Sequence, residues 1–261
     1  TEGWRGYRKD AFPSEGWSVV EGCIVHTKGG GDIVTTGTYE DFELEFEWKV
    51  AAGANSGVKY RVKEREDRGH PLGPEYQILD DVRHRDGNAP NTSAGSLYAL
   101  VEPEGKVLNL AGAWNTGRIS VHRGWLEHWV NGERVLALRV GSEDWKARIA
   151  GSKYKGVDDF GVGAGHIALQ DHGDEVWYRS IKIRDLGNPV GEKKGIIQEG
   201  SLEGWHKMGD ADYSWSEGSL LGTVTGGAQS FLLSNAEYGD FIFEVDVKTE
   251  EPGNSGIQIR T

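Results

Sequence analysis

"FELEFEWKV", residues 42–50, alternates apolar and charged side chains along its whole length. Successive side chains of a β-strand point to opposite faces, so the two sets fall on opposite sides of an extended chain. The apolar set is Phe42, Leu44, Phe46, Trp48 and Val50, and the intervening residues are three glutamates and a lysine. This pattern is typical of a strand in an antiparallel sheet with one buried and one solvated face.

Further segments with strand character follow along the chain, and only residues 142–154 favour a short helix. Within the longest of these segments, Asn131-Gly132 is a strong hairpin signal. Glycine makes up 39 of the 261 residues, which indicates many tight turns. We therefore predict an all-β fold, a jelly-roll sandwich of two antiparallel sheets. The strand-like segments are 57–62, 117–138, 165–173 and 176–186.

The composition excludes several classes of partner. A net charge of −12 argues against nucleic acid, which is bound through basic patches. No apolar run approaches the length that spans a bilayer, so no membrane insertion is expected. Cys23 is the single cysteine, which excludes an intrachain disulfide.

The chain contains an internal duplication. "ANSGVKYRV" at 54–62 corresponds to "GNSGIQIRT" at 253–261, and Asn254 follows Asn55 by 199 positions. In the same register, Tyr39, Asp41, Phe42 and Glu45 match Tyr238, Asp240, Phe241 and Glu244, and Arg61 matches Arg260. A run of matches at constant spacing indicates a repeat. We predict a first domain over 1–186, a Gly-rich linker over 187–200 and an incomplete second copy over 201–261. Such a copy would expose strand edges, so we expect it to pack on the first domain or, by self-association, on another chain.

"LGPEYQILDD", residues 72–81, carries the first candidate site residues. In a strand, Glu75 and Gln77 share one face while Tyr76 and Ile78 share the other. If the aromatic face packs between the sheets, Glu75 and Gln77 lie side by side on the outside. Asp80 then stands at the strand end, with His84 just beyond it.

Other strands add polar side chains that could share this face. In residues 166–173, the side chains of His166, Gln170 and His172 lie on the face opposite Ile167 and Leu169. In residues 57–62, alternation places Arg61 on the same face as Lys59. His128 shares a face with two aliphatic residues, so a core position is an open alternative. A sheet face lined by Glu75, Gln77, Arg61, His172 and His128 would suit proton transfer on a sugar or one metal ion. The alternative is an ordinary solvated face.

Several motifs together resemble the bacterial 3-keto-disaccharide hydrolase domain family. The motifs are "EGWRGYR", "YEDFELEFEWKV", "NSGVKYRV", "GPEYQILDD", "AGSLYAL", "GAWN", "LEHWVNG", "HIALQDHG" and "VWYRSIKIRDL". The resemblance covers residues 1–186 and, for the opening motifs alone, 201–261. It implies a concanavalin-A-like jelly roll. It also implies cleavage of glycosides already oxidised to a ketone at C3, by elimination and hydration.

The resemblance also implies a set of site residues and a cellular location. Its catalytic candidates are Glu75, His172 and His128. A divalent metal ion held by His84, Glu75 and His172 is one hypothesis for the electrophile at the ketone oxygen. The groups expected to bind an oligosaccharide or glycoside substrate are Arg61, Gln77, Asp80, Tyr98, Trp114 and Gln170. A periplasmic or extracellular location is expected. A non-catalytic carbohydrate-binding module is the alternative, because the same fold serves both roles.

Overall fold

A computed structural model of the chain describes residues 2–187, 195–223, 229–238, 243, 245–249 and 255–259. The chain divides into two compact units, Thr1–Asn188 and Pro189–Thr261. The predicted linker lies partly outside the described residues. So do several repeat positions of the second copy, namely Asp240, Phe241, Glu244, Asn254 and Arg260.

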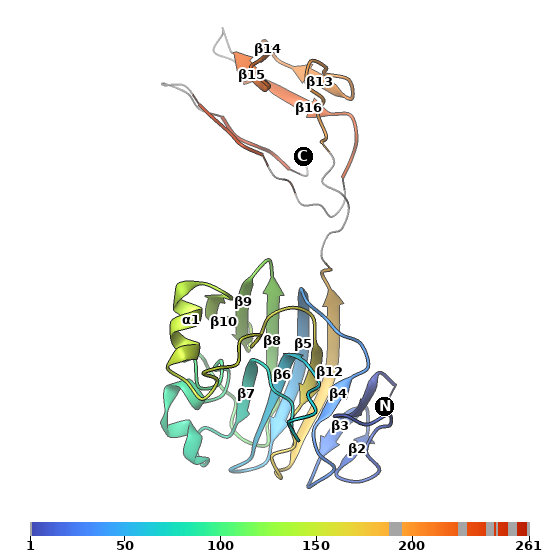
Figure 1. Cartoon of the computed structure of the whole chain (residues 1–261), viewed down its shortest axis with the longest axis vertical. Helices are drawn as coiled ribbons and strands as arrows, with labels where there is room; N and C mark the ends of the chain where they lie inside the picture. Colours follow the sequence, from blue (N-terminus) through green and yellow to red (C-terminus); the bar gives the residue numbers. More distant parts are fainter. Residues whose placement is uncertain are drawn as a thin grey trace. The chain divides into compact units, whose positions relative to one another are not determined.

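The first unit contains a seven-stranded and a five-stranded sheet, both antiparallel (Figure 1). The larger sheet has the order β10-β9-β8-β5-β12-β3-β2. Its strands are β2 (Trp17–Val20), β3 (Cys23–His26), β5 (Phe42–Val50), β8 (Asn115–His122), β9 (Trp125–Val130), β10 (Glu133–Arg139) and β12 (Val176–Asp185). The smaller sheet has the order β1-β4-β11-β6-β7. Its strands are β1 (Trp4–Gly6), β4 (Ile33–Thr35), β6 (Asn55–Val62), β7 (Glu75–Leu79) and β11 (His166–Leu169).

The alternation that predicted β5 is confirmed by its burial. All five apolar side chains of the strand are at most 3% exposed. Each such side chain stabilises the fold by roughly 1.5–3 kcal/mol relative to an exposed one. Their core also contains Val58 and Tyr60 of β6, Tyr76 and Ile78 of β7, and Ile167 of β11. Because residues of both sheets form one core, the predicted jelly-roll sandwich is confirmed.

Two local predictions are also confirmed. Strands β9 and β10 meet at Asn131-Gly132, where φ is 48° and 90°. Positive φ at both positions is what a two-residue hairpin turn needs. The one α-helix among the described residues, α1, spans Glu143–Ala150. Ser142 caps it by accepting a hydrogen bond from the Trp145 N–H.

The free edge of β7 is lined by the loop that follows two short 3₁₀ turns, η1 (Arg85–Asn88) and η2 (Pro90–Thr92). The backbone N–H of Gln77 donates to Ser96, and that of Tyr98 donates to Glu75. These bonds satisfy backbone groups that an edge strand would otherwise expose. They also hold the loop against the free edge of β7.

The second unit has four described strands in two pairs. β13 (Trp205–Met208) pairs with β16 (Phe231–Ser234), and β14 (Asp212–Ser216) pairs with β15 (Ser219–Thr223). The first unit pairs its opening strands in the same order, β1 with β4 and β2 with β3. The repeat itself stays a prediction. In the described ranges of both units, no helix has the length and apolar character needed to cross a bilayer.

Candidate functional site

The outer face of the five-stranded sheet carries a set of buried polar side chains. In the antiparallel register of β6 and β7, Lys59 lies opposite Glu75 and Gly57 lies opposite Gln77. Tyr76 and Ile78 fill the core, so Glu75 and Gln77 point the other way, as predicted. Lys59 and Glu75 are each 6% exposed, and Gln77 is 1% exposed. Polar groups buried this deeply outside the core are unusual and favour a binding or catalytic role.

Small residues form the floor beneath these groups. Ala168 of β11 lies beside Lys59, and the Gln170 N–H donates to the carbonyl of Gly57. A Cβ atom added at Gly57 would lie 2.4 Å from Glu75 Oε1. The Glu75 carboxyl therefore lies directly over the Gly57 backbone, in space that any larger residue would occupy.

The electrostatic setting of Glu75 suits a general base. Burial raises the pKa of its carboxyl, while the positive charges of Lys59, Lys153 and His172 oppose that rise. The Gln77 amide lies between Asn55 Oδ1 and Glu75 Oε1, 3.3 Å from each in its two flip orientations. A carboxyl whose pKa is raised toward neutrality accepts a proton more effectively than an ordinary one.

Asp32 is a site residue that the sequence reasoning missed. It directly precedes β4, and burial raises its pKa, with Lys59 as the main opposing charge. Its Oδ1 accepts a hydrogen bond from the Asp171 N–H at 2.8 Å. The sequence signal that could have found it is its position two residues before Val34, because alternate residues of a strand share a face. Val34 packs with Ala168 on this outer face. Asp32 follows three glycines, which obscure the strand pattern at this point.

His84 and His172 lie close together, although 88 residues separate them in the sequence. Their ring centroids are 6.1 Å apart. His84 Nδ1 accepts a hydrogen bond from the Asp86 N–H at 3.1 Å, so the proton of the neutral ring is on Nε2. His172 Nδ1 is 3.5 Å from the Asp174 carboxylate. Both rings are candidates for proton donors near Glu75.

The loop that carries His172 is held by His26, which is fully buried. His26 Nδ1 is 2.8 Å from the Asp174 carbonyl oxygen. Its Nε2 is 3.1 Å from the Gly29 carbonyl oxygen and 3.0 Å from Asp171 Oδ1. Oxygen atoms thus lie within hydrogen-bonding distance of both ring nitrogens, and these contacts tie the loop to β3.

Tyr98, Gln170 and Asp80 differ in whether their polar atoms already have partners. The Tyr98 hydroxyl donates to Asp86 Oδ2 at 3.2 Å, and burial raises its pKa to about 12. Gln170 Oε1 is buried, and none of the residues that the structure describes bonds to it. Asp80, by contrast, is engaged in its own turn. It accepts hydrogen bonds from the N–H of Gly53 at 2.7 Å and from Arg83 at 3.1 Å.

His128 lies in the core between the sheets, away from this face. It is 0% exposed, its Nε2 is 2.8 Å from the Tyr60 hydroxyl, and its Nδ1 is 3.1 Å from the Gly95 carbonyl oxygen. Burial lowers its pKa to about 4, so the ring is neutral at pH 7. The geometry supports the core alternative and not a catalytic role.

Arg61 does not share the face of Lys59, because a β-bulge interrupts the alternation of β6. Lys59 pairs with Ala168 and Val62 pairs with His166, so β6 has one extra residue between these pairs. Within this bulge Arg61 has a φ of 51°. Val62 takes the outer position instead. The Arg61 guanidinium donates to the carbonyls of Glu40 and Gly161, each at 2.9 Å, and to Asp41 at 3.2 Å.

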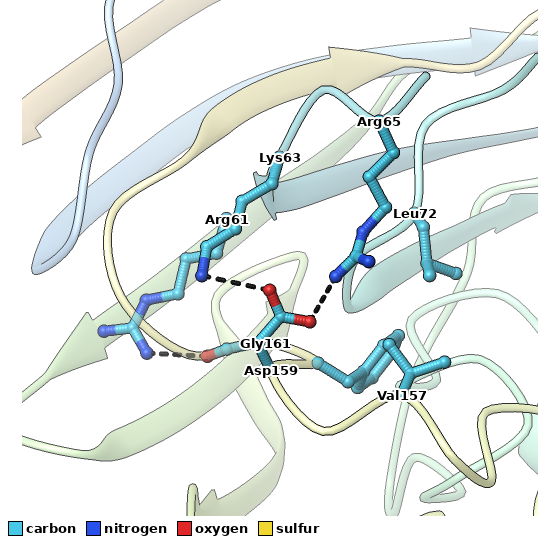
Figure 2. Close-up of a pocket in the computed structure, with 8 residues that line it drawn as sticks. Arg61, Lys63, Arg65, Leu72, Val157, Asp159 and Gly161 are labelled. Atoms are coloured by element: carbon cyan, nitrogen blue, oxygen red, sulfur yellow. Dashed lines mark hydrogen bonds and ion pairs between the residues drawn. The ribbon is translucent and has the colours of Figure 1, made fainter. Parts of the chain in front are cut away.

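Figure 2 shows the small pocket beside Arg61, of about 10 Å³. Asp159 pairs there with both Lys63 and Arg65. The volume holds about one water molecule, and these charges already have partners. This pocket is too small for a sugar.

Trp114 also lies elsewhere, on the outer face of the seven-stranded sheet. The Arg179 guanidinium lies 4.0 Å from its ring centroid and Lys49 Nζ lies 5.1 Å from it. Lys49 alternates with the buried residues of β5, which fixes the side of the sheet. Trp114 therefore does not join Glu75.

The predicted metal ligands do not form a complete ligand set. No group of three or more His, Cys, Asp and Glu side chains is arranged to hold a metal ion anywhere in the part of the chain that the structure describes. Glu75, His84 and His172 thus do not fit a three-residue site in this arrangement. A divalent ion here stays a prediction.

Several known proteins are similar to this chain. A Bacteroides thetaiotaomicron protein named 3-keto-disaccharide hydrolase is 34% identical over 218 residues, which cover 70% of this chain and 74% of that protein. A crystal structure of a candidate glycosyl hydrolase from Parabacteroides distasonis ATCC 8503 is 36% identical, with a TM-score of 0.65. It covers 71% of this chain and 89% of that one. A second such structure from the same organism is 25% identical, with a TM-score of 0.54 over 70% of this chain and 99% of that one.

A family profile matches nearly the whole sequence. Its matched segments are residues 1–184 and 195–261, and its description is the 3-keto-alpha-glucoside-1,2-lyase-like domain. The first segment contains every residue of the outer face described above. The chain belongs to the family of 3-keto-alpha-glucoside-1,2-lyase-like domains.

Proposed function

We propose that this protein is a glycoside-processing enzyme that cleaves glycosides carrying a ketone at C3, by elimination followed by hydration. Family membership and the names of the relatives support action on glycosides. The observation that carries the proposal is the Glu75 carboxyl. It is buried on the outer face of the sheet with a raised pKa, opposite a lysine and under the electrostatic influence of His172, which lies beside His84.

The first step is removal of the C2 proton. A ketone at C3 acidifies this proton, since the electrons of the broken C–H bond can delocalise onto the ketone oxygen. The Glu75 carboxylate takes the proton, and the sugar becomes an enolate with a C2–C3 double bond. Burial of the carboxyl raises its basicity and keeps competing water away.

The second step expels the group on C1. The enolate re-forms the C3 ketone, a C1–C2 double bond appears, and the C1–O bond to the aglycone breaks. His172 or His84 gives a proton to the departing oxygen, so the aglycone leaves as a neutral alcohol.

Hydration completes the reaction. Water adds its hydroxyl to C1, and Glu75 returns a proton to C2. The histidine regains its proton from the same water. The net change is the addition of one water molecule, giving the 3-keto sugar and the free alcohol.

Three side chains around Glu75 suit the binding of sugar hydroxyls. Gln170 Oε1 is buried, has no partner within the described parts of the chain, and can accept a hydrogen bond. The Gln77 side chain points outward like that of Glu75, and Tyr98 is tied to the edge of β7 by its N–H to the Glu75 carbonyl. Asp80 helps to position His84, because the His84 backbone N–H donates to the Asp80 carbonyl at 3.0 Å.

Turnover of 4-nitrophenyl 3-keto-glucoside tests the proposal. Wild-type protein is expected to release nitrophenol, and Glu75→Gln to lower kcat at least about 100-fold, because general-base catalysis contributes that much. Glu45→Gln is the matched control, since Glu45 is an exposed glutamate on the outer face of β5. A chelator arm tests the predicted divalent ion.

Two results would contradict the proposal. If Glu75→Gln and Glu45→Gln release nitrophenol at the same rate, Glu75 is not the base. If no release occurs while the parent glycan still binds, the protein is a carbohydrate-binding module on the same fold.

A further inference from the structure

Lys59 is a buried cation with no partner of its own. It is 6% exposed, and among the residues that the structure describes its ammonium makes no hydrogen bond or ion pair. Lys106 shows the usual arrangement of a shielded lysine here. Its Nζ donates to Asp81 at 2.7 Å, to Ser93 Oγ at 2.6 Å and to the Ala94 carbonyl at 2.9 Å. A buried charge without such partners lowers stability, which favours a role that a ligand completes.

The charge of Lys59 acts on two carboxyls, those of Glu75 and Asp32. It is the cross-strand neighbour of Glu75. Its charge is the largest influence that opposes the rise in pKa of both Glu75 and Asp32. Neither carboxylate lies close enough to form an ion pair with it, so its hydrogen-bonding capacity is unused.

The backbone around Lys59 carries small residues. Its neighbour across the other side of β6 is Ala168, and Gly57 lies two residues earlier on the same face. The Glu75 carboxyl lies over Gly57, on the same face as Lys59 and next to it across the strands. A substrate whose C2 contacts Glu75 would therefore place the adjacent C3 near Lys59.

We propose that Lys59 binds the C3 ketone oxygen of the substrate and stabilises the enolate that forms when Glu75 removes the C2 proton; this rests on the proposed function. The ammonium donates a hydrogen bond to the oxygen and keeps its own proton. Its charge matters most when the oxygen becomes negative, and a fixed cation aimed at developing charge lowers the barrier of that step. This chain thereby supplies an electrophile from its own residues, at the place where the sequence predicted a metal ion.

Exchange of the C2 proton measures this step directly. Methyl 3-keto-glucoside in D₂O is followed by NMR for deuterium uptake at C2, because a poor leaving group lets the enolate return to the ketone. Lys59→Met is expected to slow the exchange at least about 100-fold, and Lys59→Arg to recover part of that loss. Lys49→Met, on the outer face of the other sheet, is the control and is expected to stay within about twofold of wild type.

Thermal unfolding separates a functional from a structural role. Lys59→Met is expected to unfold at the same temperature as wild type or higher, because it removes an unpartnered buried charge. Exchange at the wild-type rate in Lys59→Met would overturn the inference. Loss of exchange accompanied by loss of the fold in both Lys59 variants would also overturn it, as Lys59 would then be structural. If wild-type protein itself shows neither exchange nor cleavage, the proposed function fails first.

Discussion

Glu75 is buried, with 6% of its surface exposed, and lies outside the core, a combination that it shares with Gln77 and Lys59. Burial raises the pKa of its carboxyl above the ordinary value of 4.5. The same carboxyl must be ionised to accept the C2 proton. Its environment therefore determines the pH range in which the protein can work.

The pH dependence of kcat/KM is predicted from that direction. Because the base must be deprotonated, the rate rises as pH rises through the Glu75 pKa, and the raised pKa moves this acidic limb above pH 4.5. Rates of C2 exchange measured from pH 4 to 8 check this. A flat profile over that range would rule out a carboxyl base with a raised pKa.

His128 is a titratable side chain whose contacts indicate a structural role. Because Nδ1 faces the Gly95 carbonyl, Nδ1 carries the proton and Nε2 accepts from the Tyr60 hydroxyl. Both polar atoms of the ring are thus satisfied within the core.

Tyr60→Phe tests this assignment. It removes the donor to a buried nitrogen and is expected to lower the free energy of unfolding by about 1–3 kcal/mol, measured by urea denaturation. C2 exchange is expected to change less than about twofold. Tyr39→Phe is the control, since no protein group in the described residues bonds to its hydroxyl. A large loss of exchange with unchanged stability would return His128 to the catalytic candidates.

At the scale of elements, the β6–β7–β11 register places the candidate site. The antiparallel pairing aligns Glu75, Lys59 and Ala168 in one row and Gln77, Gly57 and Gln170 in the next. Gly57 is the small member of its row, and the Glu75 carboxyl lies over it.

Gly57→Ala is predicted to damage activity without damaging the fold. The added methyl would meet Glu75 Oε1 at 2.4 Å, and the flexible carboxyl can move aside at small cost. A shift of this size displaces the base from its substrate, so turnover of the nitrophenyl substrate is expected to fall about 100-fold. The melting temperature is expected to change little. Gly69→Ala, where nothing lies within 4 Å, is the control; equal activity of the two variants would contradict the arrangement.

For the whole molecule, the two units differ in how well they bury apolar side chains. Ala211 is the one buried residue among the described positions of the second unit. The side chains of Phe243, Val245, Val247, Ile257 and Ile259 are 40% to 64% exposed. The predicted repeat aligns them with Leu44, Phe46, Trp48, Val58 and Tyr60, which form the core of the first unit.

Limited proteolysis is expected to cut the second unit first. Segments with few buried apolar contacts open at low free energy and are cleaved earlier. Mass spectrometry should find a stable fragment ending near residue 187. The same digest at rising protein concentration tests the predicted self-association, which would protect residues 201–261. Equal resistance of both units in a monomer, shown by sedimentation, would contradict the prediction.

The sequence by itself determined the strands and the faces of their side chains. Alternation in 42–50 and in 75–79 follows from the two-residue period of a strand, which is a local property. It therefore identified the core side of β5 and the outward direction of Glu75 and Gln77. Asn131-Gly132 specified its hairpin for an equally local reason, positive φ.

The tertiary structure decided which faces meet. Alternation cannot tell which of two sheets a strand joins, so Trp114 was grouped with Glu75 although they lie on different sheets. It also fails at a bulge, where one extra residue reverses the parity, as happened at Arg61. His128 lies in the core because its nitrogens find Tyr60 and Gly95, which are distant in sequence. The same long-range packing of strands and loops brings His84 beside His172. It also brings Glu75 and Asp32 under the influence of the Lys59 charge.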